Sequence, residues 1–444
     1  MKLGPRLVVA GTASGVGKTT VATGLMAALR ARGVAVAPAK VGPDFIDPGY
    51  HTLATGRPGR NLDAWLCGES ALSALAAQAG AGADLLVIEG VMGLFDGAGS
   101  TAEASTAHVA RLLDAPVVLV VDASAMSGSV AALVHGYATF DPGIQIAGVI
   151  LNRVGSDGHE LLLREALGPT KMPVLGALRR DGRLSWRDRH LGLVPVVERP
   201  QQTRASLDRL AVAVEQSVDL DRVVQLALTA PPAATPPLPT ARPSGRCRLA
   251  VAAGPPFSFI YPDNLERLQQ AGAELLPFDP MNDAALPDGV DGLIAGGGFP
   301  EVFAADLAAN APLLADVKTK VRTGLVTWAE CGGLLWLARE LDGRTMCEVI
   351  DADARMTDRL TLGYRTATLR SPSPLAARGA ELRGHEFHYS TIDPAGDAMH
   401  LEGRFGRGPA GWASPTMLAS YLHVHLGAAP ELAERLVRTA ARVT

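Results

Sequence analysis

Residues 7–20 read LVVAGTASGVGKTT, and this stretch decides the fold of the first half of the chain. Its first four residues form a continuous apolar run, as expected of a strand that is covered on both faces of a sheet. A glycine-rich turn follows, and Lys18 then opens a stretch of helical composition. Glycines between a strand and a helix let backbone N–H groups point into a concavity, where the helix N-terminus adds partial positive charge. The segment therefore predicts a loop that binds phosphate groups.

The loop departs in one position from the usual pattern G-x-x-x-x-G-K-[ST], because its first glycine is Gly11 and residue 12 is a threonine. Lys18 is still placed to reach the β- and γ-phosphates of a nucleotide, and the hydroxyl of Thr19 to ligate Mg²⁺. The strand before the loop and the helix after it favour a variant phosphate loop that binds ATP. A plain tight turn is the alternative interpretation.

Short apolar runs alternate with longer helical stretches throughout the first half. The strands expected there are Arg6–Ala10, Val34–Ala39, Leu85–Glu89, Val117–Val121 and Gln145–Leu151, and the helices are Lys18–Arg32, Ser70–Ala79, Glu103–Leu113 and Ser127–Ala138. The runs are continuous, which is typical of a parallel sheet with helices on both faces. We therefore predict an α/β, doubly wound, P-loop NTPase-like domain.

Residues 229–245 interrupt this rhythm and read TAPPAATPPLPTARPSG. Their prolines remove backbone donors and favour an extended conformation. We interpret them as a linker between domains 1–228 and 246–444, with a long surface loop inside one domain as the alternative. After the linker, strands are expected at Leu249–Ala253, Glu274–Phe278, Gly292–Ala295, Leu325–Ala329 and Ala419–His423, and helices at Asn264–Gln270 and Glu431–Arg442. A second doubly wound parallel-sheet domain is predicted.

The composition supports two globular domains and excludes several other classes of protein. A chain of 444 residues is too long for one ordinary core, and 48% of it is hydrophobic. The net charge of −4 gives no reason to expect nucleic acid or an anionic membrane as a partner. Cys67, Cys247, Cys331 and Cys347 form no C-x-x-C pair, which favours a reducing compartment. Without a leader or a spanning apolar run, a cytoplasmic protein is expected.

Acidic residues follow the ends of predicted strands in the first half. Glu89 ends the run LLVIE, and Asp96 follows it in MGLFDG. A second cluster, KVGPDFIDPGYH at residues 40–51, contains Lys40, Asp44 and Asp47. Ligands of parallel sheets gather outside the carboxyl ends of the strands, and acids there can hold Mg²⁺ directly or through water. Together these acids favour a functional site, although for any single one a solvated loop carboxylate is the better interpretation.

The second half carries a candidate nucleophile in residues 324–334, GLVTWAECGGL. The pattern predicts a strand, a sharp turn at Cys331 and a helix. A helix N-terminus is expected to lower the pKa of this thiol and to favour the nucleophilic thiolate. The alternative is that Cys331 is a buried hydrophobic residue.

Partners for such a thiol are available elsewhere in the second half. Gly297 and Gly298, in AGGGFPE, together with Gly332, could present backbone N–H groups as an oxyanion hole. A base is available in SYLHVHL, where His423 and His425 would lie on one side of a strand because side chains alternate. A structural role for these histidines is the alternative.

Taken together, the motifs resemble those of the cobyrinic acid a,c-diamide synthase family, which includes the hydrogenobyrinic acid a,c-diamide synthases of cobalamin biosynthesis. The matching segments, in family order across both domains, are GTASGVGKTT, KVGPDFIDPGYH, GRPGRNLD, VIEGVMGLFDG, GVILNRV, GGGFPE, AECGGLLWL, GHEFHYS and SYLHVHL. The first half also resembles dethiobiotin synthetase in its G-T-x-x-x-V-G-K-T loop, and the second resembles class I glutamine amidotransferase domains.

The resemblance implies a ligase that uses ATP, L-glutamine and a polycarboxylate corrinoid. Glutamine would be hydrolysed through a thioester on Cys331, with release of ammonia. ATP, with Mg²⁺, would phosphorylate a side-chain carboxylate of the corrinoid, and ammonia would displace the phosphate to give an amide. The cycle would run twice, on the a and c acetates. An acyl phosphate is a physically sensible intermediate, because a carboxylate alone is a poor electrophile.

The same resemblance implies site residues in the first half. The residues implied to bind ATP are Gly15, Val16, Gly17, Lys18, Thr19, Lys40 and Asn152, the last as an adenine contact, and the metal ligands are Thr19 and Glu89. Asp44, Asp47 and Asp96 are implied as catalytic residues near the activated carboxylate, with Phe45 and Ile46 beside them. Arg57, Arg60 and Asn61 are candidates to bind the carboxylates of the corrinoid.

One departure concerns the base of the amidotransferase half. Class I domains usually follow the catalytic histidine with Pro-Glu, but here Val424 and His425 follow His423. The third member of a triad is therefore not identified, and a Cys-His dyad is an option. Because related cobyric acid synthases carry a Y-x-H-G segment, His423 is favoured over His425 as the base.

Two other functions remain open at this stage. One is another corrinoid amidotransferase of the same superfamily, and the other is a P-loop regulatory ATPase with an inactive amidotransferase domain. GHEFHYS and KVGPDFIDPGYH favour the diamide synthase, and the joint presence of Cys331, GGGFPE and SYLHVHL favours an active second domain. The sequence does not decide between a cobalt-containing and a metal-free ring, and it leaves the oligomeric state open, with a homodimer as one option.

Overall fold

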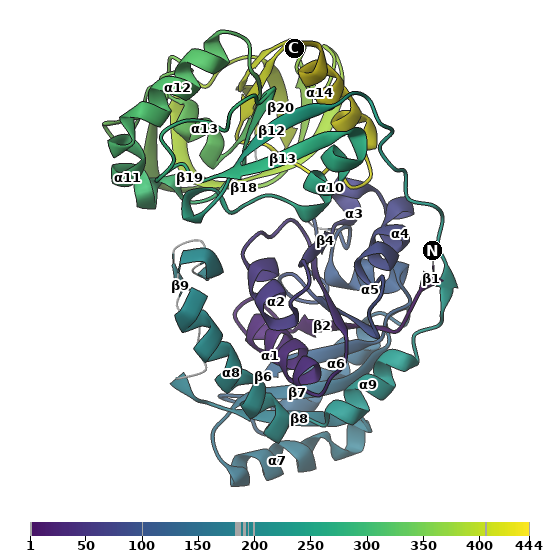
Figure 1. Ribbon diagram of the computed structural model, residues 1–444. Coiled ribbons are helices and arrows are strands. Elements are labelled where there is room, and N and C mark those ends of the chain that lie inside the picture. Colours follow the sequence, from purple (N-terminus) through teal and green to yellow (C-terminus); the bar gives the residue numbers. More distant parts are fainter. Residues whose placement is uncertain are drawn as a thin grey trace. The chain divides into compact units, whose positions relative to one another are not determined.

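The computed structural model describes residues 2–99, 101–182, 188–189, 192–193, 195–198, 200–404 and 406–443. The chain divides into two compact units, Met1–Leu238 and Pro239–Thr444 (Figure 1). The division falls inside the proline-rich segment 229–245. Part of this segment is bound to the first unit, because β11 (Ala233–Ala234) pairs with β1 (Lys2–Leu3) in an antiparallel ladder.

The first unit is built on a seven-stranded sheet with the order β4-β3-β5-β2-β6-β7-β8. Its strands are β2 (Arg6–Gly11), β3 (Val36–Val41), β4 (Arg60–Leu62), β5 (Leu85–Glu89), β6 (Val117–Asp122), β7 (Ile146–Val154) and β8 (Val174–Arg179). All neighbouring strands are parallel. β3, β4 and β5 lie on one side of β2, and the later strands β6, β7 and β8 lie on the other, so the direction in which strands are added reverses at β2. Ligands of such sheets bind outside the carboxyl ends of the strands at this reversal.

Helices connect these strands, and the doubly wound prediction is confirmed for this unit. They are α1 (Lys18–Ala31), α2 (Asp47–Thr55), α3 (Ala64–Cys67), α4 (Glu69–Ala79), α5 (Thr106–Leu112), α6 (Ser129–Phe140), α7 (Asp157–Leu167), α8 (Pro200–Ser217) and α9 (Leu220–Leu228). One core cluster packs apolar side chains of α1, α8 and α9 against β2, β5 and β6. Smaller elements are η1 (Gly168–Thr170), β9 (Asp188–Arg189), β10 (Gly192–Leu193) and η3 (Val196–Glu198).

The second unit contains a six-stranded sheet with the order β13-β12-β14-β15-β23-β22. Its strands are β12 (Cys247–Ala252), β13 (Ala273–Phe278), β14 (Gly292–Ala295), β15 (Val326–Glu330), β22 (Trp412–Ser414) and β23 (Met417–Ser420). Five are parallel, as predicted, and β22 adds an antiparallel edge. The helical elements are η4 (Pro255–Phe257), α10 (Pro262–Ala271), η5 (Pro300–Phe303), α11 (Ala304–Ala309), α12 (Ala311–Arg322), α13 (Gly332–Leu337) and α14 (Pro430–Val443).

A second sheet in this unit was not predicted from the sequence. It is mostly antiparallel and contains β16 (Glu340–Leu341), β17 (Arg344–Thr345), β18 (Asp353–Leu369), β19 (Glu381–Asp393), β20 (Met399–Gly403), β21 (Gly406–Ala410) and β24 (His423–Val424). The long hairpin of β18 and β19 forms its centre (Figure 1).

The predicted strand Ala419–His423 is wrong as a single element, because the structure divides it between the two sheets. β23 ends at Ser420 beside β15, and β24 begins at His423 beside β19. The chain turns between them, and the Ser420 hydroxyl accepts a hydrogen bond from the backbone N–H of Leu422. Among the described residues, no helix combines the length and the apolar character needed to cross a membrane.

Candidate active sites

The phosphate loop follows β2 and is held in place by residues at the end of β7. Asn152 donates a hydrogen bond from its side-chain amide to the backbone carbonyl of Val16 at 2.9 Å. The neighbouring Arg153 donates from its guanidinium to the carbonyl of Gly15 at 2.9 Å and pairs with Asp122. Asn152 therefore braces the loop with one of its two amide hydrogens, and the adenine contact expected from the sequence stays a prediction.

Gly17 shows why the loop needs a glycine at this point. Its φ of 93° is in the left-handed region, and a Cβ atom there would lie 2.2 Å from Nδ2 of Asn152. Any side chain would therefore collide with the amide that holds the loop. Arg153, which also contacts the loop, was missed in the sequence, although it follows Asn152 directly in the LNR segment.

Lys18 opens α1 and is almost completely buried. Its ammonium group donates to the carbonyl of Ala13 within the loop at 3.2 Å. Burial, with the positive charge of Lys40 as the next cause, lowers the pKa of Lys18 to about 8. A cation held inside the loop is what a triphosphate requires.

Thr19, Asp47 and Glu89 converge beside this loop. The Thr19 hydroxyl lies 2.7 Å from Glu89 Oε1 and 3.3 Å from Asp47 Oδ2. Lys40 reaches the same two carboxylates, with Nζ 2.6 Å from Asp47 Oδ2 and 2.9 Å from Glu89 Oε1. The structure therefore brings four of the residues predicted from the sequence into one cluster at the carboxyl ends of β3 and β5.

The electrostatics of this cluster keep Glu89 and Lys40 ionised. Burial alone would raise the pKa of Glu89, but Lys40, His51 and the Thr19 hydroxyl lower it below its ordinary value. Burial likewise opposes the charge of Lys40, whereas Asp47, Glu89 and Asp44 raise the pKa of Lys40 above its usual range. The cluster is thus a mutually compensated set of charges in the core.

The donor set of Thr19, Asp47 and Glu89 fits Mg²⁺. The three oxygens that face one another are a hydroxyl and two carboxylate oxygens, and hard oxygen ligands of this kind are those Mg²⁺ prefers. Asp47 was expected as a catalytic residue, and its position beside Thr19 gives it a place among these donors.

His51 belongs to the same cluster and was not singled out in the sequence. Its Nε2 lies 2.6 Å from Glu89 Oε2, both side chains are fully buried, and its Nδ1 has no hydrogen-bond partner within the described part of the chain. A signal was present, because His51 follows Asp47 by four residues in α2 and residues at that spacing share one face of a helix.

Asp44 lies in the loop between β3 and α2, and Asn61, in β4, contacts that loop. Asp44 Oδ1 accepts hydrogen bonds from the backbone N–H groups of Ile46 at 2.7 Å and Asp47 at 3.1 Å. Burial and the nearby charge of Asp47 raise the pKa of Asp44 to about 7. Asn61 donates to the carbonyls of Gly42 and Asp44, at 2.8 and 2.7 Å, and so braces the loop instead of being free to bind a ligand.

The other candidates in the first unit, which include the predicted catalytic residue Asp96, are dispersed. Phe45 is half-buried and Ile46 is buried in this same loop. Asp96 is exposed, accepts a hydrogen bond from the N–H of Gly93 at 2.8 Å and acts electrostatically on Lys18. Arg60 is the first residue of β4 and pairs with Ala39.

Arg57 does not join the cluster. Its guanidinium donates to the carbonyls of Ala81 and Gly82, in the turn that leads into the amino end of β5. This is the edge of the sheet opposite the phosphate loop, so the expected role of Arg57 in binding a carboxylate is not supported by its position.

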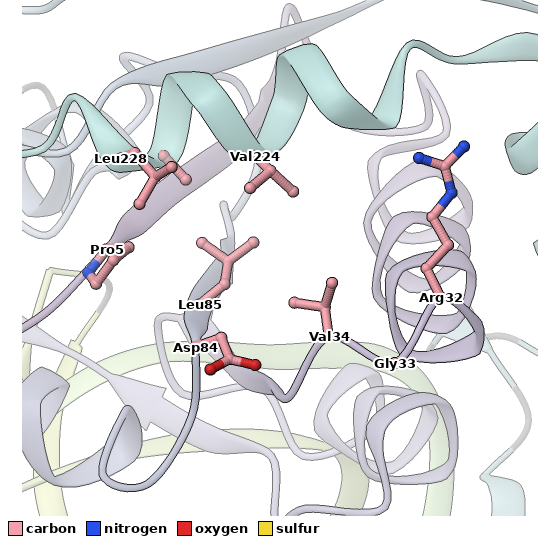
Figure 2. A pocket seen from close by; sticks show the side chains of 9 residues that line it. Pro5, Arg32, Gly33, Val34, Asp84, Leu85, Val224 and Leu228 are labelled. Atoms are coloured by element: carbon pink, nitrogen blue, oxygen red, sulfur yellow. The ribbon is translucent and has the colours of Figure 1, made fainter.

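A cavity of about 290 Å³ also lies at this opposite edge (Figure 2). Its lining comes from the amino ends of β2, β3 and β5, from the end of α1 and from α9, and consists of Pro5, Arg32, Gly33, Val34, Asp84, Leu85, Val224, Ala227 and Leu228. It contains none of the predicted site residues.

In the second unit, Cys331 occupies the sharp turn between β15 and α13. Its φ of 48° is in the left-handed region, which is a strained conformation for a residue with a side chain. Its N–H donates to the carbonyl of Ser420 in β23 at 2.8 Å, which fixes the turn at the carboxyl end of the parallel sheet. The predicted strand–turn–helix geometry is present.

The expected lowering of the pKa of this thiol is not found. Burial and the charge of Glu301 raise the pKa of Cys331 well above its ordinary range, with Glu330 and Glu386 adding to the effect. The N–H of Gly332 donates to the thiol and opposes the shift, but α13 has only 6 residues and its N-terminus does not outweigh burial and three acids. The resting group is therefore a thiol that needs a base.

His423 lies beside two of the features predicted for catalysis, the GGGFPE turn and the nucleophile turn. A Cβ atom on Gly297 would lie 2.5 Å from Cε1 of His423, so the imidazole lies directly beside the GGGFPE turn. Its Nδ1 is 3.4 Å from Oε2 of Glu330, the residue that precedes the nucleophile. The ring also stacks on His385 of β19 at 4.9 Å between centroids.

His425 has different surroundings, and the two histidines do not share one strand face as predicted, because β24 ends at Val424. Its ring packs on Tyr261 at 4.6 Å, its Nδ1 accepts a hydrogen bond from the N–H of Gly427, and its Nε2 lies 4.0 Å from Asp263 Oδ2. These contacts fit a structural role.

The three glycines expected to form an oxyanion hole differ in the contacts of their backbone N–H groups. The N–H of Gly297 already donates to the carbonyl of Phe259 at 3.0 Å, so Gly297 is not a free donor, and its part is to leave room for His423. Gly298 N would lie 3.1 Å from a Cβ on Gly332, which places it against the nucleophile turn. The N–H of Gly332 points at the sulfur of Cys331.

Comparisons with known proteins also find one nucleotide-binding half and one amidotransferase half in this chain. Residues 7–193 match the model of the CobQ/CobB/MinD/ParA nucleotide binding domain, and residues 248–431 match the CobB/CobQ-like glutamine amidotransferase domain. The chain is 50% identical to a hydrogenobyrinate a,c-diamide synthase of Streptomyces coelicolor, over 98% of this chain and 97% of that protein. It is 50% identical to the protein of that name from Thermobifida fusca, over 97% and 96%.

A cobyrinate a,c-diamide synthase of Synechococcus is 43% identical, with 99% of both chains covered. Relatives of both names thus align along almost the whole chain and through both units. The resemblance noted in the sequence is confirmed, and the chain belongs to the family of hydrogenobyrinate and cobyrinate a,c-diamide synthases.

Proposed function

We propose that the protein converts the a- and c-acetate carboxylates of a corrinoid, hydrogenobyrinic or cobyrinic acid, into amides, with ATP and L-glutamine as co-substrates. The observation that carries the proposal is the presence, in one chain, of two complementary sites. One is a phosphate loop beside buried carboxylates, and the other is a thiol at a strained turn beside a histidine. The near-complete alignment with relatives of this name supports the same conclusion.

The amidotransferase half would release ammonia from glutamine. His423 takes the proton of the Cys331 thiol, and the sulfur attacks the side-chain amide carbon of glutamine. The C–N bond breaks, the leaving nitrogen takes that proton from His423, and ammonia departs. Water then hydrolyses the thioester to glutamate and regenerates the thiol. The N–H groups of Gly298 and Gly332 are the candidates to stabilise the oxyanion.

The synthetase half would activate the acceptor. The carboxylate of the corrinoid attacks the γ-phosphorus of ATP, which gives an acyl phosphate and ADP, and ammonia then displaces phosphate to leave the amide. Lys18 offsets charge on the phosphoryl group that is transferred. Mg²⁺ bound to Thr19, Glu89 and Asp47 would neutralise further phosphate charge. Asp44, with a pKa of about 7, can exchange a proton near neutral pH.

The substrate and the setting are also part of the proposal. Relatives at 50% identity are named for the metal-free ring and one at 43% for cobyrinate, so both rings are the substrates to test. A reaction that consumes ATP and glutamine fits the cytoplasm, and neither co-substrate requires a nucleic acid or a membrane as partner.

Replacement of the nucleophile tests the proposal directly. With ATP, Mg²⁺ and glutamine, mass spectrometry of each ring after the reaction should show two amides added by the wild-type protein. Cys331→Ser should lose amidation from glutamine by at least about 10³-fold, because the thiolate is the better nucleophile, yet keep amidation when ammonium chloride replaces glutamine. Amide formation from glutamine by Cys331→Ser, or no amidation of either ring by the wild type, would contradict the proposal.

A further inference from the structure

We propose that Glu330, the residue immediately before the nucleophile, is the positioning residue that completes a Cys-His-Glu triad in this protein. The inference rests on the proposed glutamine hydrolysis and goes beyond it, because the carboxylate comes from a place in the chain where class I amidotransferases do not supply it. Those domains take it from the second residue after the histidine, a position that is His425 here.

The two carboxylate oxygens of Glu330 make different contacts. Its Oε1 accepts a hydrogen bond from the backbone N–H of Val424 at 2.9 Å, which ties β15 to β24. Its Oε2 lies 3.4 Å from Nδ1 of His423, an ion-pair distance without hydrogen-bond geometry. Both side chains are buried, at 3% and 1% exposure, so water does not screen the pair. One carboxylate therefore fixes the strand that carries the histidine and faces its ring nitrogen.

This contact has a chemical consequence at the other ring nitrogen. A carboxylate beside Nδ1 favours the tautomer with the proton on Nδ1, which leaves Nε2 free to take a proton from the thiol. The carboxylate also stabilises the imidazolium that forms. Cys331 needs this help, because burial raises the pKa of its thiol well above the ordinary value.

Other groups near His423 do not replace Glu330. His385 stacks on the ring from β19, but burial and its histidine neighbours lower the pKa of His385 well below the ordinary value, so it is neutral. Glu301 and Glu386 act electrostatically on Cys331.

Glu330→Gln is the sharpest variant, because it preserves size and keeps an oxygen to accept from Val424. Its amide NH₂ would then face Nδ1 of His423 and favour the wrong tautomer. We expect kcat for glutamate release, measured in the full reaction mixture, to fall by about 10²–10⁴-fold. The acidic limb of the pH profile of kcat/KM should move to lower pH, because the variant lacks the carboxylate that stabilises the protonated imidazole of His423. The melting temperature should change little.

Asp263→Asn is the matched control, since Asp263 is a buried acid that faces the other histidine, His425. It should leave the acidic limb in place. A normal rate in Glu330→Gln, or a lower rate with an unmoved acidic limb, would overturn the proposal and leave Glu330 as a structural residue. Equal shifts in both variants would overturn it as well. A wild-type protein that releases no glutamate would instead refute the proposed function, so the two failures are distinguishable.

Discussion

Lys40 illustrates how single residues of the first unit depend on one another. Its ammonium group is buried, and its charge is compensated by Asp47 and Glu89. Glu89 in turn accepts a hydrogen bond from Thr19 and contacts His51. Removal of one partner would leave an uncompensated charge in the core, which is much more destabilising than the loss of an exposed ion pair. Single substitutions here should therefore be interpreted as perturbations of the whole cluster.

Lys18 leads to a prediction about pH. Its pKa of about 8 means that the free loop loses its cation as the pH rises through that value. ATP binds the protonated form, so affinity should be highest below pH 8 and should weaken by about tenfold between pH 7 and pH 9. Titration calorimetry with Mg²⁺ and a non-hydrolysable ATP analogue checks this.

The variant Lys18→Ala is the control for that measurement. It should abolish binding at both pH values. Equal affinity of the wild type at pH 7 and pH 9, or normal binding by Lys18→Ala, would show that Lys18 does not hold the phosphates.

For Cys331, the local sequence predicted the backbone turn but not the direction of the pKa shift of the thiol. The sequence predicted its turn correctly, because glycines after a short apolar run are visible in the pattern. The direction of its pKa was predicted wrongly, since burial and the acids that raise it come from several separate segments of the chain. Glu330 was missed although it is adjacent in sequence, because its contact with His423 spans 93 residues.

At the scale of elements, the break between β23 and β24 decides how the histidines are used. β23 stays in the parallel sheet and holds the nucleophile turn through the Ser420 carbonyl, whereas β24 joins the antiparallel sheet beside β19. His423 is thereby directed to the turn at Gly297, and His425 to Tyr261.

This difference predicts opposite outcomes for two alanine variants. His423→Ala should lower glutamine hydrolysis by about 10²–10⁴-fold with little change in melting temperature, because it removes the base. His425→Ala should mainly lower the melting temperature, because it removes a ring packed against Tyr261. Glutamate release and differential scanning fluorimetry measure the two effects. A normal rate in His423→Ala with a lost rate in His425→Ala would reverse the assignment.

At the scale of the whole molecule, each of the three hydrophobic core clusters found among the described residues lies within one unit. One cluster is built from α1, α8, α9 and the first sheet, and two others lie within the second unit. Separate cores generally unfold as separate cooperative units.

We therefore expect two transitions in scanning calorimetry. A non-hydrolysable ATP analogue with Mg²⁺, at 100 times its Kd, should stabilise one of them by about 2.7 kcal/mol and leave the other in place. The variant Lys18→Ala should lose that shift. A single transition, or equal shifts of both, would mean that the units unfold together.

The sequence by itself determined the two α/β halves, the phosphate loop, the nucleophile turn and the family, because continuous apolar runs, glycine turns and short motifs are local signals. Only the tertiary structure decided which side chains meet. In the structure, Asn152 contacts the phosphate loop and Arg57 contacts the turn before the amino end of β5. His51 contacts Glu89, and Glu330 contacts His423. These pairings join strands and helices distant in sequence, and no local pattern encodes the register that brings them together.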